Sequence, residues 1–266
     1  MNKPNSYSIG DLLPQIIGEH PEGAVDRLLC GRHETRVTAI ATAFVASMSV
    51  LHQAAQLGVN LLITHEGLYY SHHEGEEWGR TSLPAKEKAR WIEENGMGIV
   101  RLHDRVHRQF PDLIMEGLLR ELEWEYAVLE RQATYAIVEL PDWTLIEVSD
   151  QVKRKLGLSY LRAAGPSSLR CRRVGLLVGY RGSGAQTIPL WEQANVDLII
   201  AGEGPEWEAP EYARDAVRLG LNKGLILLGH AESESPGMRL LADQMAVRLP
   251  GLPVHYLADS PVFRIL

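Results

Sequence analysis

The sequence contains few cysteines and no long apolar run. Only two cysteines, Cys30 and Cys171, occur among 266 residues, and they form no CxxC pair. This excludes a disulfide framework and is typical of a reduced, cytoplasmic protein with buried thiols. No stretch approaches the roughly 18 apolar residues that span a bilayer, and the first residues lack the apolar segment of a signal peptide. We therefore expect a cytoplasmic protein that does not enter a membrane.

The sequence also lacks a large basic region. Its net charge is −7, and its basic clusters are short: "KRK" at 153–155 and "RCRR" at 170–173. A nucleic-acid-binding protein would carry a basic patch or stripe, so we expect no nucleic-acid partner. Hydrophobic residues make up 45% and charged residues 23%, which is the composition of an ordinary globular protein able to bury a substantial core.

Apolar runs of strand length alternate with amphipathic segments along the chain. The predicted strands are 37–44, 60–64, 98–102, 135–140, 172–179, 197–202, 224–229 and 253–257. The predicted helices are 47–58, 84–96, 111–124, 144–157, 187–194, 209–220 and 235–249. This alternation predicts an α/β fold of parallel sheets covered by helices.

We place the domain joint near residues 124–130. The prediction is two α/β domains, 1–126 and 127–266, with a metal cleft between them to which the last ~40 residues return. The final long helix should begin with Ser235 as its N-cap and Pro236 at its first position.

Three predicted strands end in side chains that can bind a metal ion. A single histidine at such a position is commonly structural, but three tips of this kind in one chain favour a shared role. Imidazole nitrogens and carboxylate oxygens are common ligands of zinc, iron and manganese. The tips carry His65 and Glu66; His103, Asp104 and His107; and His230 and Glu234.

The spacing within these tips supports the metal interpretation. If "HDRVH" is helical, His103 and His107 lie at i and i+4 on one face and can reach one ion. Glu234 directly precedes the expected helix N-cap, where an acid can also serve only the helix dipole. Glu203 follows another strand end, as Glu66 does, and ligands bind outside the carboxyl ends of such strands.

Two further motifs have simpler interpretations. The turn "GYRGSG" at 179–184 can present amide groups to a phosphate, but we favour a tight strand-to-helix turn that needs positive φ. The pair His72 and His73 lies in the polar stretch "SHHEGEEWG". This stretch is typical of an exposed loop, and we do not expect these histidines to be metal ligands.

The order of these motifs resembles the NIF-three-like family, also called dinuclear metal-centre hexameric proteins and often labelled GTP cyclohydrolase I type 2 homologues. The resemblance covers residues 25–266. The family's Ile-Thr-His-His-Pro corresponds to "LLITHEGLYY", its His-x-x-x-Asp to "RLHDRVH", and its Gly-His-x-x-x-Glu to "GHAESE". The glycine-rich turn and a later Gly-Glu also match "VGLLVGYRGSG" and "LIIAGE".

Carried across by position, the resemblance implies a site for two divalent ions (Zn, Fe or Mn). Its ligands would be His65, Glu66, His103, His107, His230 and Glu234. The family's second histidine is Glu66 here and its aspartate is His107, so an imidazole and a carboxylate have changed places. Asp104 can substitute for His107 as the carboxylate ligand.

Two functions follow from this site. One is a metal-dependent hydrolase acting on a phosphorylated or nucleotide-like small molecule, in which Glu203 or Asp104 moves protons. The other is a non-catalytic metal-binding or scaffolding protein, including a form in which the exchanged ligands no longer hold metal. The resemblance implies a homo-hexamer in either case, and the small-molecule ligand is not identified.

Overall fold

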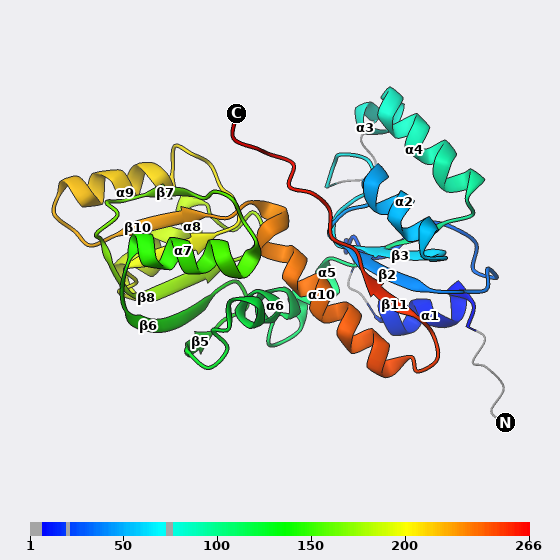
Figure 1. The fold of residues 1–266 in the computed structure, drawn as a ribbon, viewed down its shortest axis with the longest axis horizontal. Helices are drawn as coiled ribbons and strands as arrows, with labels where there is room; N and C mark the ends of the chain where they lie inside the picture. Colours follow the sequence, from blue (N-terminus) through cyan, green and yellow to red (C-terminus); the bar gives the residue numbers. More distant parts are fainter. Residues whose placement is uncertain (1–6, 20–21, 73–76) are drawn as a thin grey trace. The chain divides into compact units, whose positions relative to one another are not determined.

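The predicted strands form two separate sheets in a computed structural model of the chain, which describes residues 7–19, 22–72 and 77–266 (Figure 1). The chain divides into two compact units. The first comprises Met1–Gln109 with Met238–Ser260, and the second comprises Phe110–Gly237 with Pro261–Leu266. The boundary predicted at 126–127 falls inside the second unit, because β5 (Val128–Arg131) pairs with β6 (Ala136–Thr144) of that unit's sheet.

The first unit is built on a sheet with the strand order β1-β4-β3-β2-β11. Strands β11, β2, β3 and β4 are parallel, and β1 is antiparallel to β4. The strands are β1 (Arg27–Cys30), β2 (Ile40–Ala43), β3 (Leu61–Thr64), β4 (Gly98–Arg101) and β11 (Val254–Tyr256). The helices are α1 (Ile9–Ile16), α2 (Met48–Gln56), α3 (Glu77–Thr81), α4 (Leu83–Glu94) and α5 (Asp104–Arg108).

Both faces of this sheet are covered, which explains why its inner strands read as continuous apolar runs. Ala41 and Leu62 face a core shared with α2 and with Ile92 of α4. The neighbouring residues point to the other face, where the side chains of Ile9 of α1 and Leu61 both lie close to Gly98. In Figure 1, α1 and α2 accordingly lie on opposite sides of the strands.

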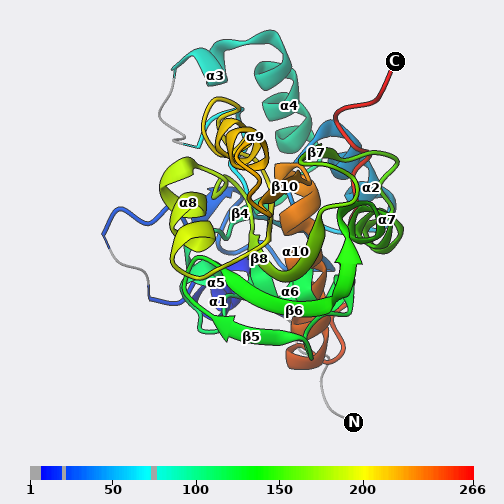
Figure 2. The same ribbon diagram turned by 90° about the vertical axis from the view of Figure 1, so that its left-hand side faces the viewer.

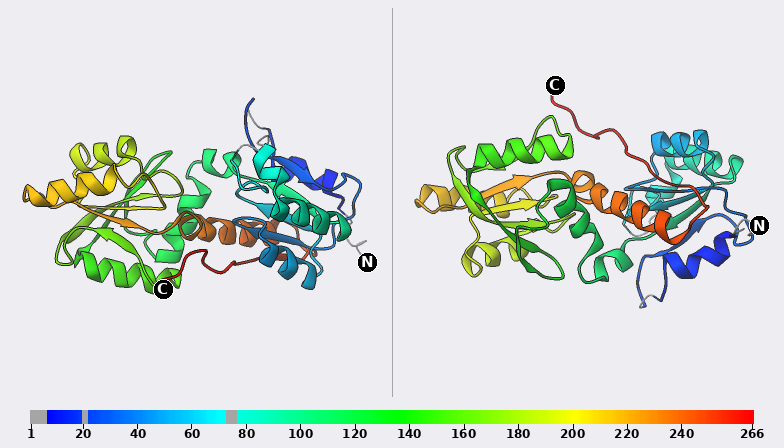
Figure 3. Two further views of the ribbon diagram at one scale, coloured as in Figure 1. Left: turned by 90° about the horizontal axis from the view of Figure 1, so that it is seen from above. Right: turned by 60° about the horizontal axis from the view of Figure 1, so that its bottom comes forward.

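The second unit is built on a sheet with the order β5-β6-β8-β9-β10-β7, in which β8, β9 and β10 are parallel. Its core packs α8 and α9 on one face, and α7 covers the other (Figures 2 and 3). The remaining strands are β7 (Arg162–Ala164), β8 (Arg170–Leu177), β9 (Leu198–Ala201) and β10 (Gly224–Leu227). The helices are α6 (Leu113–Leu122), α7 (Leu145–Leu156), α8 (Gly184–Glu192) and α9 (Ala209–Arg218).

The last helix, α10 (His230–Arg248), begins five residues earlier than the sequence predicts, so the expectation of an N-cap at Ser235 is wrong. Pro236 lies inside the helix, where its missing N–H normally disfavours it. Tertiary contacts hold the first turn in place. The Ser233 hydroxyl donates to the His230 carbonyl and accepts the N–H of Gly179 at 2.9 Å.

The structure can be compared with two predictions from the sequence, that the thiols are buried and that no segment spans a membrane. Cys171 is buried, and burial together with Asp197 raises the pKa of its thiol to about 12, so it is inert at neutral pH. Cys30 is only partly buried. Among the described residues, no helix has the length and apolar character needed to cross a membrane.

Candidate metal centre

Two neighbouring parallel strands of the first unit deliver polar side chains to the same edge of the sheet. Thr64 at the end of β3 is in register with Arg101 at the end of β4. The chain then continues from β3 into His65 and Glu66, and from β4 through Leu102 into His103. Because carboxyl ends of parallel strands share one edge, the two tips meet as the sequence predicts.

Helix α5 places the histidines of the second tip, and a distant carboxylate holds its start. Asp26 is fully buried and accepts the backbone N–H groups of His103 at 2.6 Å and Asp104 at 2.8 Å on Oδ1. Its Oδ2 accepts the N–H of Arg105 at 2.7 Å. Asp26 therefore satisfies the amide groups that a helix start leaves without partners. The predicted helical spacing of His103 and His107 is confirmed.

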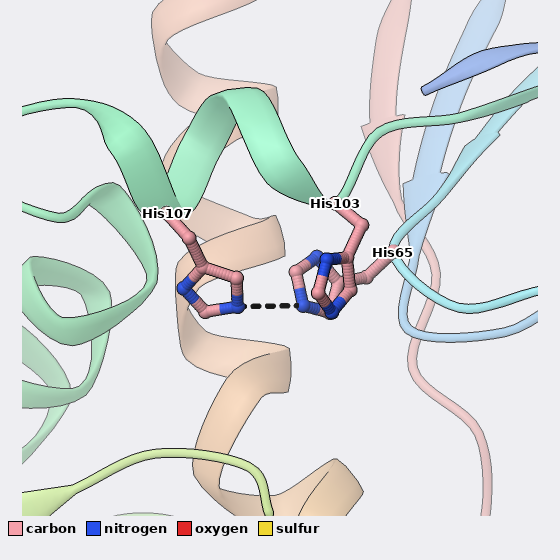
Figure 4. Close-up of side chains that lie close together, drawn as sticks. All are labelled: His65, His103 and His107. Atoms are coloured by element: carbon pink, nitrogen blue, oxygen red, sulfur yellow. Dashed lines mark hydrogen bonds between the residues drawn. The ribbon is translucent and has the colours of Figure 1, made fainter. Parts of the chain in front are cut away.

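Three imidazoles converge in front of these elements (Figure 4). The ring of His65 stacks on that of His103 at 4.5 Å, and His107 contacts both rings edge-on at 4.9 and 5.0 Å. Nε2 of His107 lies 3.2 Å from Nε2 of His65. Two nitrogens bound to one tetrahedral zinc ion at about 2.0–2.1 Å would be roughly 3.3 Å apart. The observed spacing therefore suits one shared ion.

The second nitrogen of two of these rings is already held by an acceptor. Nδ1 of His65 lies 3.2 Å from the Leu102 carbonyl, and Nδ1 of His103 lies 3.0 Å from Oδ1 of Asp104. Both partners accept, so Nδ1 carries the proton and Nε2 presents its lone pair. Metal-binding histidines are oriented in this way by second partners.

The electrostatics of the cluster favour neutral rings. Burial and the neighbouring His65 lower the pKa of His103 to about 4, against the opposing influence of Asp104 and Glu66. The pKa of Asp104 is also lowered: burial acts to raise it, but the hydrogen bonds from His103 and Val25 outweigh that effect. At neutral pH, His103 is thus an uncharged imidazole beside an ionised carboxylate, which is the state that a metal ligand needs.

Glu66 joins this cluster through a buried arginine that sequence reasoning overlooked. Arg101 is fully buried, and its Nη2 donates to Oε2 of Glu66 at 2.9 Å. Oε1 of Glu66 lies 3.7 Å from Nε2 of His103. The signal in the sequence was a charge inside the apolar run "GIVRL", because a buried charge requires a partner.

The loop after β3 adds a histidine that the sequence places outside the site. Nη1 of Arg101 donates to the His72 carbonyl at 2.6 Å, and Nη2 lies 3.0 Å from its Nδ1. The His72 ring lies 5.1 Å from that of His103, although 47% of its side chain is exposed. His72 belongs with Glu66 and His103 to a group of donors close enough to hold a cation. His73 lies outside the described residues.

A second cluster lies in the second unit, at the ends of β9 and β10. Nδ1 of His230 lies 2.8 Å from Oε1 of Glu203, and its Nε2 lies 3.1 Å from Oε2 of the buried Glu234. His230 and Glu234 occupy positions i and i+4 of α10. Glu203 thus orients His230 as Asp104 orients His103.

The loop after β8 comes very close to this cluster. A Cβ atom on Gly179 would lie 2.1 Å from Oε1 of Glu234, and Gly179 has a φ of +61°. Glycine is therefore required here for two reasons: the backbone is left-handed, and the Glu234 carboxylate lies too close for a side chain. The tight-turn interpretation of "GYRGSG" holds at this residue.

The phosphate interpretation of that turn finds no support. The N–H of Gly184 at the start of α8 donates to Oε2 of Glu208 at 2.6 Å, and the N–H of Gly182 donates to the Glu203 carbonyl. Arg181 pairs with the buried Asp112 at 3.1 Å. A carboxylate of the chain itself thus occupies the place where a phosphate would bind.

Within each unit, predicted site residues lie close to one another. The first brings together His65, Glu66, His103, Asp104 and His107, and the second brings together Glu203, His230 and Glu234. Asp26, His72 and Arg101 are the residues that sequence reasoning did not select. Asp26 carried no local signal, because its partners lie far along the chain.

Comparison with known proteins places this chain among well-defined relatives. The sequence model of the Duf34/NIF3 (NGG1p interacting factor 3) family matches residues 26–260. A protein of Clostridium perfringens named "GTP cyclohydrolase 1 type 2 homolog" is 24% identical over 229 residues, covering 84% of this chain and 83% of that protein. A Deinococcus radiodurans protein of the same name is 26% identical over 254 residues, covering 91% and 87%.

Solved structures share the fold at low identity. A Staphylococcus aureus hypothetical protein has a TM-score of 0.74 at 17% identity, with 98% of this chain and 100% of that chain covered. A Bacillus cereus protein related to NIF3 has a TM-score of 0.67 at 15% identity, with 97% and 98% covered. These likenesses establish the α/β architecture of the chain.

Proposed function

Because this chain belongs to the Duf34/NIF3 family and its first unit carries a cluster of imidazoles arranged as ligands, we propose that it binds divalent metal ions and uses them to hydrolyse a phosphorylated or nucleotide-like small molecule. One observation carries the proposal. His65, His103 and His107 turn ring nitrogens toward one point, while carbonyl and carboxylate oxygens hold Nδ1 of two of the rings.

The donor chemistry fits a borderline divalent ion. Three imidazoles without a cysteine suit Zn²⁺ or Fe²⁺, and three protein ligands leave a position for substrate in a four-coordinate ion. A bound ion would supply Lewis acidity and would lower the pKa of a coordinated water. In the second unit, His230 and Glu234 are the proposed ligands of a second ion, so that the chain would bind two.

The contacts of the two predicted proton carriers support a different role for them. Asp104 and Glu203 each lie against Nδ1 of a proposed ligand. A carboxylate in that place fixes the tautomer and orientation of the ring and raises its basicity. We therefore assign Asp104 and Glu203 as positioning residues, with proton transfer as the alternative to be tested.

The substrate class is inferred from relatives alone. The names of the Clostridium perfringens and Deinococcus radiodurans proteins refer to GTP cyclohydrolase, which suggests a nucleotide-like ligand. The homo-hexamer implied by the family resemblance is likewise a proposal, and light scattering on the purified protein would test it.

Elemental analysis of the purified protein tests the metal proposal. We expect near-stoichiometric metal in the wild type, a loss of metal in His65→Ala and in His230→Ala, and no change in His33→Ala, which alters an exposed histidine outside both clusters. Wild-type protein without metal, even after supplementation with zinc, iron and manganese, would contradict metal binding.

A substrate screen then separates an enzyme from a binder. Phosphatase, phosphodiesterase and cyclohydrolase substrates should be tried with the metal-loaded protein, and His65→Ala serves as the control. Turnover that depends on His65 supports the hydrolase. Stoichiometric metal without turnover of any of these substrates would favour a non-catalytic metal-binding or scaffolding protein.

A further inference from the structure

We propose that Arg101 takes the place of a second cation in the first unit and withholds Glu66 from the metal ion. The first unit would then hold one ion on three imidazoles, with Glu66 beside it as a hydrogen-bond acceptor. This inference rests on the proposed metal-binding function of the same cluster. It differs from the ligand set that the sequence predicts, in which Glu66 binds metal in place of a histidine.

Arg101 donates hydrogen bonds to the loop that contains Glu66. Its guanidinium is fully buried, and its Nε donates to the His65 carbonyl at 3.4 Å. Its two terminal nitrogens reach three further acceptors of the loop after β3. These are Oε2 of Glu66 at 2.9 Å, the His72 carbonyl at 2.6 Å and Nδ1 of His72 at 3.0 Å. A guanidinium only donates hydrogen bonds, so each of these atoms must act as an acceptor toward it.

Glu66, His72 and His103 form a second group of possible metal donors. Their ligand atoms lie close enough together to hold a cation. Arg101 already supplies a positive charge to two of these three residues. A metal ion entering there would compete with Arg101 for the Glu66 carboxylate and place a second positive charge beside a buried guanidinium, which is strongly unfavourable. An ion on the three imidazoles disturbs none of these contacts.

The charges around the ion on the three imidazoles favour Zn²⁺ over Mn²⁺. His65, His103 and His107 are the donors, and an imidazole binds a metal ion through an uncharged ring nitrogen. The charges of Glu66 and Arg101 cancel one another, and Asp104 lies against Nδ1 of His103, the nitrogen that does not face the ion. Neutral nitrogen donors suit Zn²⁺, whereas Mn²⁺ and Mg²⁺ favour carboxylate oxygen. The exchange of the family's aspartate for His107 acts in the same direction, since it removes a carboxylate.

The contacts of Glu66 define its role. Arg101 holds Oε2, while Oε1 lies 3.7 Å from Nε2 of His103. That oxygen is beside the donor atoms but beyond hydrogen-bonding distance of this nitrogen. It is placed to accept a hydrogen bond from a protic group, such as water, an alcohol or an amine, in the ion's remaining position.

Zinc titration of the full-length protein tests the inference. Every variant carries His230→Ala, which removes the imidazole donor of the second cluster. The parent protein carries His230→Ala alone. We expect it to bind one Zn²⁺, with an affinity at least about a hundredfold higher than its affinity for Mn²⁺. Glu66→Gln should keep one Zn²⁺ with an affinity within about threefold, and His107→Ala should weaken binding by at least about a hundredfold. His107→Asp should narrow the preference for Zn²⁺ by about tenfold.

Further variants separate a metal effect from a folding effect. Arg101→Gln removes the guanidinium that competes for Glu66, so Glu66 can bind the ion, and Mn²⁺ affinity should rise by about tenfold. If Arg101→Gln does not fold, the double variant Glu66→Gln with Arg101→Gln removes both charges and should bind one Zn²⁺ as the parent does. Circular dichroism confirms the fold of each variant.

The outcomes are distinguishable. A parent that binds no Zn²⁺ contradicts the proposed metal-binding function of this cluster. A parent that binds Zn²⁺ together with a Glu66→Gln variant that loses it as completely as His107→Ala does would overturn the inference, because Glu66 would then be a ligand. Two Zn²⁺ ions in the parent would also overturn it.

Discussion

The carboxylate of Asp26 accepts the backbone N–H of His103 at 2.6 Å, although 77 residues separate the two along the chain. This bond ties the segment before β1 to the start of α5. The helix is too short to be stable alone, so its position depends on this external cap. Asp26 thereby controls the placement of two of the three imidazoles without contacting either ring.

Replacing Asp26 should damage stability and metal binding together. In Asp26→Ala, three partly buried N–H groups lose their acceptor, and we expect the free energy of unfolding to fall by about 2–4 kcal/mol. Zinc affinity should fall by about 10–100-fold, as is usual when a supporting partner is lost. Urea unfolding and zinc titration measure the two effects. Asp11→Ala is the control: it removes an exposed capping box in α1 and should cost about 1 kcal/mol without changing zinc affinity.

The metal-free protein should lose stability as the pH falls from about 6.5 to 4. Burial and the neighbouring His65 hold the pKa of His103 near 4 in the folded state, below its unfolded value of about 6.5. Between these two pH values His103 binds a proton in the unfolded chain but not in the folded chain. The free energy of unfolding therefore falls as the pH falls, by on the order of 3 kcal/mol for this group. Urea unfolding at pH 7 and pH 4.5 measures the loss. His103→Gln should lose clearly less stability than the wild type does over this interval, and an equal loss would contradict the assignment.

Removing the partner of His230 should weaken the second cluster only. In Glu203→Ala, Nδ1 of His230 loses the carboxylate at 2.8 Å, and we expect metal affinity there to fall by about 10–100-fold. Glu203→Gln keeps an acceptor oxygen and should have a smaller effect. Elemental analysis in a His65→Ala background reports on this cluster alone. Glu206→Ala changes an exposed carboxylate that pairs with Arg162 and should leave the metal content unchanged.

Gly179→Ala should destabilise the second unit more than a comparable substitution elsewhere. Both Gly179 and Gly58 have positive φ, but a Cβ on Gly179 meets Oε1 of Glu234 at 2.1 Å, whereas a Cβ on Gly58 meets nothing within 4 Å. Gly58→Ala should cost about 1 kcal/mol from backbone strain alone. Gly179→Ala should cost about 2–4 kcal/mol, because Glu234 must also move. Thermal unfolding compares them, and equal shifts in Tm would show that the close approach is relieved without cost.

The α/β class followed from periodicity, because strands buried on both faces read as short apolar runs and their helices as amphipathic segments. The predicted strands at 37–44, 60–64 and 98–102 correspond to β2, β3 and β4. The candidate site was visible for the same reason, since polar residues such as His65 and His230 stand out where an apolar run ends. Sequence spacing also placed His103 and His107 on one helical face.

Local rules did less well where a distant contact outweighed them. The first turn of α10 forms upstream of Pro236 because Ser233 is bonded to Gly179, 54 residues away. The short strand β5 has too little periodicity of its own to be recognised. In each case the stabilising contacts come from residues that are too far along the chain for a local sequence pattern to include them.

The sequence by itself therefore determined which residues carry chemistry and which strand ends present them. Only the tertiary structure decided what those residues contact. Arg101 lies in a strand and Glu66 in the loop after another, and their ion pair exists because parallel strands bring residues 35 apart to one edge of the sheet. Asp26, just before β1, reaches α5 because β1 pairs antiparallel with β4, so that the start of β1 lies beside the end of β4. Charge pairing and helix capping act over a few ångströms of space, and the fold alone sets those distances.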